Sequence, residues 1–166
     1  MKKKLVIFDL DGTLLNTIDD LATGANHALA VLGYPTHDAA TIRTFVGNGI
    51  NKLLERALPE GEKTEENILR MRSVFIPYYD EHNADLTVPY EGVPELLVRL
   101  QEEGVQLAVA SNKYQAATEK IVAQLFPDTF DVVLGEREGV ARKPDPQIVY
   151  DILSDRSDKS DVSDRS

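Results

Sequence analysis

The fold is decided by one stretch near the N-terminus, Leu5-Val6-Ile7-Phe8-Asp9-Leu10-Asp11-Gly12-Thr13. Its apolar residues indicate a strand buried on both faces, as strands are in a parallel sheet. The simpler interpretation is that this strand is followed by a solvated acidic turn without a function. The full Asp-x-Asp-Gly-Thr pattern instead favours a functional site. Because open α/β sheets bind ligands beyond the carboxyl ends of their strands, we expect a site at Asp9 and Asp11.

The composition limits the class of protein. A chain of 166 residues can form one domain, or one domain with a small insertion. Its net charge of −10 argues against nucleic acid or an anionic membrane as the main partner, because both bind basic surfaces. A small anionic substrate stays compatible, since local cations can hold a phosphate. There is no cysteine, which excludes thiolate chemistry. We expect a soluble cytoplasmic protein, because Asp9 interrupts the short N-terminal apolar run.

Residues 15–85 predict helices and no strand. The expected helices begin near Thr17, Ala39, Ile50 and Thr64. Thr17 is a candidate N-cap, with Asp20 three residues later, and Pro77 is expected to kink or end the fourth helix. Four helices without a strand are too many for one crossover between strands. We therefore expect an inserted helical cap domain over residues 15–85 rather than helices packed on the sheet.

Strands and helices alternate again over residues 86–153. The expected elements are a helix from Val93, a strand over 105–110, a helix over 115–125, a strand over 130–134 and a short helix from Pro146. Together with residues 1–14 they predict an α/β catalytic core with a parallel sheet. Residues 154–166 repeat Ser-Asp-x with a single apolar residue and predict a disordered acidic tail.

Polar side chains follow the expected strands at one edge of this sheet. They are Asp9, Asp11 and Thr13 after the first strand, Ser111, Asn112 and Lys113 after the second, and Lys143 in the loop after the third. Transfer of an anionic phosphoryl group needs a nucleophile, oriented donors and cations. Asp9 suits the nucleophile that forms an aspartyl-phosphate, and Asp11 suits the general acid and base. The expected phosphate-binding residues are Gly12, Thr13, Ser111, Asn112 and Lys143.

Two carboxylates facing a phosphate would repel it. A divalent cation that prefers oxygen ligands, Mg²⁺ in the first place, resolves this repulsion. Asp9 and Asp11 are therefore its expected ligands.

The chain resembles the haloacid dehalogenase superfamily of hydrolases, and within it the phosphoglycolate phosphatase group. The resemblance rests on Asp9 to Thr13 as the first motif, Ser111-Asn112-Lys113 as the second, Lys143-Pro144 as the third, and the stretches 45–49 and 90–93. It implies a Rossmann-like core with a helical cap, an Mg²⁺ cofactor held also by the backbone carbonyl of Asp11, and hydrolysis of a small phosphorylated metabolite. It also implies that the cap selects the substrate, which makes Arg43, Gly47 and Asn48 candidate contacts.

One departure from the family leaves alternatives open. The family's fourth motif, an apolar strand ending in Gly-Asp whose acid completes the metal site, is lacking after Lys143. The alternatives are a sugar-phosphate mutase of the same family and a truncated, non-catalytic fragment that binds phosphate or metal. Dehalogenation and phosphonate cleavage are disfavoured, because family members with those activities lack an acid at the place of Asp11.

Overall fold

The computed structural model describes residues 4–163, with side chains described as far as residue 155. The described residues divide into two compact units: Leu15–Val88 forms one, the helical unit, and the residues before and after it form the other, the sheet unit. Within residues 4–163 no helix combines the length and the apolar character that crossing a membrane requires.

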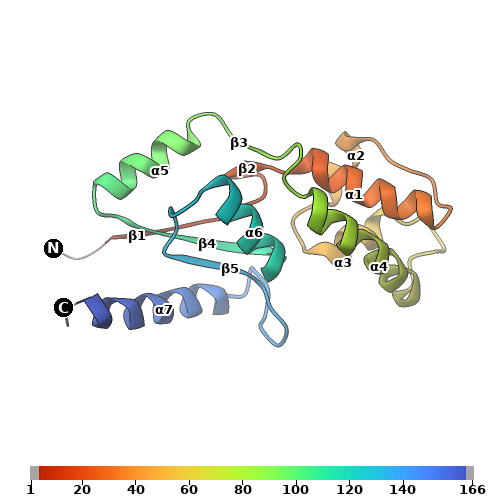
Figure 1. Ribbon diagram of the computed structural model, residues 1–166. Helices are drawn as coiled ribbons and strands as arrows, with labels where there is room; N and C mark the ends of the chain where they lie inside the picture. The colour runs from red at the N-terminus through yellow and green to blue at the C-terminus, as the bar shows by residue number, and fades with distance from the viewer. Residues whose placement is uncertain (1–3, 164–166) are drawn as a thin grey trace. The chain divides into compact units, whose positions relative to one another are not determined.

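The sheet unit contains three parallel strands. They are β1 (Leu5–Phe8), β4 (Gln106–Tyr114) and β5 (Val132–Glu136), in the spatial order β1-β4-β5 (Figure 1). Phe8 pairs with Val109, and Ala110 pairs with Leu134. The predicted α/β class with a parallel sheet is therefore confirmed, and the carboxyl ends of the three strands meet at one edge.

The prediction that β1 is buried on both faces is wrong. All four of its residues, Leu5–Phe8, are only half-buried, whereas Leu107, Ala108 and Val109 in β4 are fully buried. The strand order explains the difference: β4 lies in the centre of the sheet, and β1 has a partner on one side only among the strands of the described residues. The apolar run predicted a strand correctly, but its composition does not encode its place in the sheet.

Three helices accompany this sheet: α5 (Val93–Glu102), α6 (Gln115–Leu125) and α7 (Gln147–Ser163). Figure 1 shows α5 and α7 on opposite sides of the sheet. Ile148 and Ile152 of α7 pack with Ala108, Ala110 and Val132 in a buried core cluster. The backbone of residues 154–163 continues α7, where the sequence predicted a disordered tail. Residues 147–153 anchor the start of this helix, and its propagation then costs less than nucleation. Residues 164–166 of the predicted tail lie outside the described residues.

The polar end of the central strand is irregular. Ser111, Asn112 and Lys113 belong to β4, which extends beyond the predicted end at Ala110 to Tyr114. The pairing with β5 shifts register between Ala110 and Tyr114. Such an irregularity bends a strand and re-aims its side chains, and it is common beside functional sites.

The helical unit contains the four predicted helices. They are α1 (Ile18–Val31), α2 (Ala39–Phe45), α3 (Ile50–Ala57) and α4 (Glu65–His82). The two short strands β2 (Leu15–Asn16) and β3 (Val88–Pro89), which form a second sheet, were not predicted. Pro77 lies inside α4, which continues to His82. Because proline has no N–H, Pro77 cannot donate the usual helical hydrogen bond to the carbonyl oxygen of Ser73. Ser73 is exposed, so water can solvate that carbonyl.

A buried carboxylate links the two ends of the helical unit. Asp20, only 4% exposed, accepts hydrogen bonds from the Leu86 N–H (2.9 Å), the Thr87 N–H (2.7 Å) and the Thr87 hydroxyl (2.7 Å). Thr17 is the N-cap residue of α1, as predicted, but its side chain makes no capping hydrogen bond. Asp20 thus contributes to tertiary structure, a role that local sequence spacing does not reveal.

Replacing Asp20 with alanine is expected to lower the free energy of unfolding of the helical unit by about 2–4 kcal/mol. The substitution removes hydrogen bonds to a charged acceptor and leaves the buried Thr87 N–H without it. Urea denaturation followed by circular dichroism measures the effect. Asp19→Ala is the matched control, because Asp19 is the exposed neighbour in the same helical turn, and its effect should stay below about 0.5 kcal/mol. Equal effects of the two substitutions would contradict this assignment.

Candidate functional site

Asp9 and Lys143 meet at the carboxyl edge of the sheet. The Lys143 ammonium donates to Asp9 Oδ1 at 2.9 Å and to the Ala110 carbonyl oxygen at 2.7 Å. Asp9 Oδ1 also accepts from the Leu10 N–H at 2.8 Å. The side chains of Asp9 and Lys143 are 47% and 29% exposed, so a ligand in solution can reach both. A carboxylate with a fixed cation beside it can attack an anionic phosphorus centre, because the cation offsets the repulsion.

Asn112 fixes the loop that carries this lysine. Its Oδ1 accepts from the Lys143 N–H at 3.0 Å, and its Nδ2 donates to the Lys143 carbonyl oxygen at 3.2 Å. The amide therefore holds the backbone on both sides of the Lys143 side chain. The predicted contact of Asn112 with phosphate stays a prediction, beside this observed role in positioning Lys143.

Asp11 has a lysine partner of its own. Lys113 Nζ lies 3.1 Å from Asp11 Oδ1, and the two side chains are only 5% and 15% exposed. The sequence places Lys113 at the end of the second strand and in the second motif, but it was not among the predicted catalytic, phosphate-binding or metal-binding residues. A signal was nevertheless available: Lys113 stands two residues after Ser111, and side chains two apart in a strand tend to share a face.

The other predicted phosphate contacts lie at the same edge. Ser111 is 1% exposed, and its hydroxyl oxygen accepts from the Lys113 N–H at 3.0 Å. Gly12 is exposed and has a φ of +78°, a conformation that side chains disfavour. The exposed Thr13 closes a turn, since its N–H donates to the Leu10 carbonyl oxygen at 3.2 Å. Contacts of Gly12, Thr13 and Ser111 with a phosphate remain predictions.

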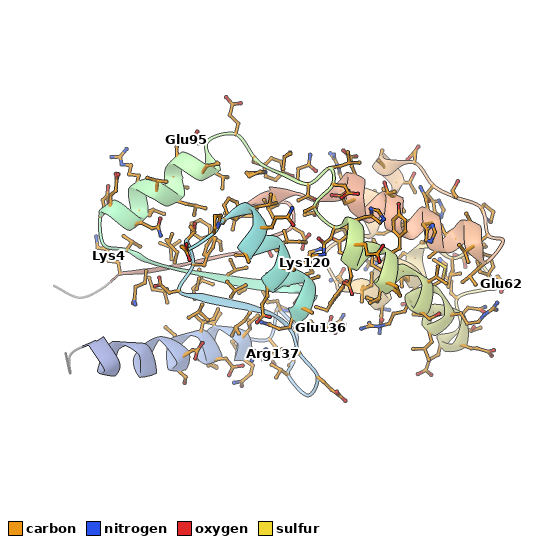
Figure 2. All side chains as sticks on the ribbon, viewed as in Figure 1. Lys4, Glu62, Glu95, Lys120, Glu136 and Arg137 are labelled. Carbon is orange, nitrogen blue, oxygen red and sulfur yellow. The ribbon has the colours of Figure 1, made fainter. Side chains whose placement is uncertain are left out.

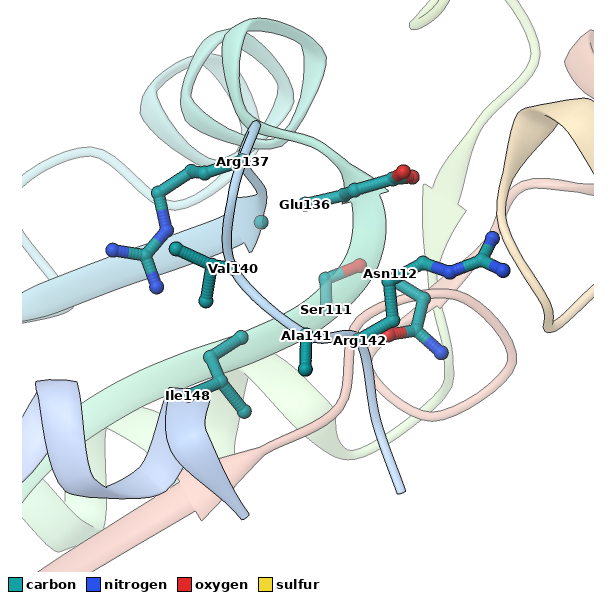
Figure 3. A pocket seen from close by; sticks show the side chains of 9 residues that line it. Ser111, Asn112, Glu136, Arg137, Val140, Ala141, Arg142 and Ile148 are labelled. Carbon is teal, nitrogen blue, oxygen red and sulfur yellow. The ribbon is translucent and has the colours of Figure 1, made fainter. Parts of the chain in front are cut away.

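A small pocket adjoins Ser111 and Asn112. Figure 3 shows the side chains of Glu136, Arg137 and Arg142 around it. Glu136 and Arg137 lie at the end of β5 and just after it (Figure 2). The remaining lining residues are Gly135, Val140, Ala141 and Ile148.

One of these arginines is partly fixed by an ion pair. Arg137 Nη2 lies 2.8 Å from Asp151 Oδ2, and Arg137 Nε is buried without a hydrogen-bond partner among the described residues. A hydrogen bond from the Gln147 side chain, and to a smaller extent one from Arg137, holds the pKa of Asp151 below its usual value. Asp151 therefore stays ionised beside Arg137 at neutral pH.

The donor set at the sheet edge fits a magnesium ion. Mg²⁺ is commonly bound through one or two carboxylates and keeps several waters, and Asp9 and Asp11 supply two. Between residues 4 and 155, no group of three His, Cys, Asp or Glu side chains could hold a metal ion. A lysine ammonium lies within 3.1 Å of one oxygen of each carboxylate. A cation would therefore share Asp9 and Asp11 with Lys143 and Lys113.

The candidate substrate contacts of the helical unit lie in the last turn of α2 and in the loop that follows it. Arg56 donates to the Phe45 carbonyl oxygen at 2.9 Å and to Asn48 Oδ1 at 3.0 Å. Gly47 has a φ of +118°, and Arg43 is exposed in the last turn of α2. Contacts of Arg43, Gly47 and Asn48 with a substrate remain predictions.

Comparison with known sequences gives a family match over almost the whole chain. The family model described as haloacid dehalogenase-like hydrolase matches residues 6–162. A phosphoglycolate phosphatase of Psychrobacter arcticus is 40% identical over 154 residues, covering 88% of this chain and 66% of the relative. One of Haemophilus influenzae is 36% identical, covering 89% of this chain and 69% of the relative. The chain thus spans about two thirds of the length of these relatives.

Comparison with solved structures agrees with the sequence match. A crystal structure of a candidate phosphoglycolate phosphatase from Lactobacillus delbrueckii subsp. bulgaricus has a TM-score of 0.84 and 34% identity. It is matched over 93% of this chain and 73% of that one. A crystal structure of a candidate phosphoglycolate phosphatase from Haemophilus somnus has a TM-score of 0.84 and 32% identity. It is matched over 95% of this chain and 73% of that one.

Proposed function

Because the chain belongs to the haloacid dehalogenase-like hydrolase family, we propose that it is a phosphatase that hydrolyses a small phosphomonoester of the phosphoglycolate kind. The observation that carries the proposal is that the Lys143 ammonium lies 2.9 Å from Asp9 Oδ1, with a second carboxylic acid, Asp11, two residues after Asp9. The printed names of the relatives support the substrate class.

In the first half of the reaction, an Asp9 carboxylate oxygen attacks phosphorus and forms an aspartyl-phosphate. The bond from phosphorus to the ester oxygen breaks, and its electron pair stays on that oxygen. The protonated Asp11 carboxyl gives its proton to the same oxygen, which leaves as an alcohol. Lys143 supplies fixed positive charge to the phosphoryl oxygens as the charge on them shifts.

The second half returns the enzyme to its starting state. A water oxygen attacks phosphorus, and the Asp11 carboxylate takes a proton from that water. The bond between phosphorus and the Asp9 oxygen breaks, which restores the Asp9 carboxylate and releases phosphate. The sum is ester plus water giving alcohol plus phosphate.

A magnesium ion belongs to the same proposal. The Asp9 carboxylate and the Asp11 backbone carbonyl would hold it, which leaves the Asp11 carboxyl for proton transfer, and it would supply positive charge and orientation for the phosphoryl oxygens. The role left to the chain is to keep the two carboxylates in place, which the contacts with Lys143 and Lys113 do.

The test of this proposal is phosphate release from a panel of small phosphomonoesters that includes 2-phosphoglycolate. We expect release with Mg²⁺ and a loss of at least about 10²-fold with EDTA, because the electrostatic clamp on the phosphoryl group is removed. Restoring Mg²⁺ should restore the rate. Hydrolysis that survives EDTA, or no hydrolysis of any ester, would contradict the proposal. Transfer of the phosphoryl group to a sugar phosphate in preference to water would instead indicate the mutase of the same family.

A further inference from the structure

We propose that Lys113 is the positioning residue for Asp11, and that proton transfer to the leaving oxygen depends on the Lys113 ammonium. The inference rests on the proposed function and concerns a residue to which sequence reasoning assigned no role. It has a specific consequence: loss of Lys113 should harm esters with poor leaving groups far more than esters with good ones.

The geometry of the two aspartates differs in the way this role requires. Asp9, the proposed nucleophile, is 47% exposed, whereas the Asp11 side chain is 15% exposed. Lys113 Nζ holds Asp11 Oδ1 at 3.1 Å from a position that is almost inaccessible to water. One oxygen of Asp11 is thereby fixed from the protein side. A general acid has to present its proton at one place, and small displacements cost a large part of the rate.

The backbone around Lys113 is fixed as well. Its N–H donates to Ser111 Oγ at 3.0 Å, and its carbonyl oxygen accepts from Thr118 Oγ1 at 3.1 Å. The neighbouring residue of β5 is Gly135, where a Cβ atom would lie 2.6 Å from Thr118 Oγ1 and would overlap the Lys113 carbonyl oxygen. The close approach of β5 therefore holds Lys113, and Lys113 in turn holds Asp11.

A purely stabilising role explains this arrangement less well. Removing an ammonium and a carboxylate from water costs free energy that their attraction often fails to recover, so a buried ion pair is weak evidence for stability. An apolar residue at position 113 would avoid that cost. The placement of a buried cation on the proposed acid, at the edge where the substrate reacts, instead points to a role in orienting that acid.

The leaving group separates the two explanations. The leaving group of an alkyl ester such as 2-phosphoglycolate is a strongly basic alkoxide unless Asp11 protonates its oxygen. The leaving group of 4-nitrophenyl phosphate is a weakly basic phenolate that departs without a proton. A general loss of structure slows leaving-group release from both esters. A misplaced Asp11 slows it selectively for the alkyl ester, whereas the later attack of water on the aspartyl-phosphate is common to both esters and is kept out of the comparison by single-turnover measurement.

The experiment compares the full chain with Lys113→Met, Lys113→Arg, Asp11→Asn and the Asp11→Asn/Lys113→Met double variant on both esters. In single-turnover reactions, we expect Lys113→Met to lower the rate of alcohol release from the alkyl ester by about 10²-fold and the rate of 4-nitrophenolate release by less than about 10-fold. Lys113→Arg, which keeps the charge, should lose less. The double variant should discriminate between the esters no more than Asp11→Asn does, because both changes act on one proton transfer.

The matched control is Lys120→Met, which removes an exposed lysine of α6 (Figure 2) and should leave both rates unchanged. If Lys113→Met fails to fold because the Asp11 carboxylate is left buried without its cation, the double variant keeps the test possible, since it removes both charges. Equal losses in the single-turnover release of the two leaving groups, or additive losses in the double variant, would overturn the inference alone. Inactivity of the unsubstituted chain toward both esters would overturn the proposed function, and this inference with it.

Discussion

Replacing Asp9 with asparagine is expected to lower phosphate release by at least about 10³-fold. The amide has the shape of the carboxylate and can still accept from the Leu10 N–H and from Lys143, so the surroundings of position 9 are preserved. Its oxygen is a far weaker nucleophile, and the aspartyl-phosphate cannot form. The measurement is the steady-state rate with 2-phosphoglycolate and with 4-nitrophenyl phosphate.

The loss should be equally severe for both esters, because every ester needs the nucleophile. This distinguishes Asp9 from Asp11, whose loss the good leaving group should partly relieve. Asp19→Asn is the control, since it removes an exposed carboxylate from the helical unit and should leave the rate unchanged. An Asp9→Asn variant that keeps its thermal transition and more than a tenth of the activity would exclude Asp9 as the nucleophile.

Replacing Lys143 with methionine is expected to lower kcat/KM by roughly 10²–10³-fold. The Lys143 ammonium lies 2.9 Å from Asp9 Oδ1. Asn112 holds the Lys143 backbone through two hydrogen bonds that do not involve the side chain, so the substitution removes charge and leaves the loop in place. Steady-state kinetics over a range of ester concentrations measure the loss.

Lys120→Met is again the matched control, because it makes the same chemical change at an exposed position of α6. The thermal transition of Lys143→Met should move little, since a partly exposed ion pair contributes only about 0–1 kcal/mol to stability. A loss of activity that follows a loss of folded protein would indicate a structural role. Unchanged kcat/KM would remove Lys143 from the site.

The structure confirms what the sequence predicted about the class of fold, for a clear physical reason. The short apolar runs of β1, β4 and β5 satisfy their backbone groups by pairing with one another in a sheet. The parallel arrangement then brings Asp9 to the edge at which Ser111 and Lys143 also lie. The half-burial of β1 was not predictable, because it follows from the strand order and not from the residues of the strand.

Other features depended on contacts between residues far apart in the sequence. The sequence places Lys113 at the edge of the sheet, but the ion pair that it forms with Asp11 is evident only from the structure. Asp20 looks like a helix-start residue, yet its partners lie 66 and 67 residues later. Helical continuation through residues 154–163 requires the preceding turn of α7 as its nucleus, which composition alone does not show.

The central claim is that turnover proceeds through an aspartyl-phosphate on Asp9, and the most direct measurement traps that species. The full chain is mixed with 2-phosphoglycolate and Mg²⁺, quenched in acid during turnover, reduced with borohydride and mapped by peptide mass spectrometry. Borohydride converts an acyl phosphate to an alcohol, so the proposal predicts homoserine at position 9, dependent on substrate and absent from Asp9→Asn. Phosphate release with position 9 unmodified, or with the modification at another carboxylate, would contradict the claim.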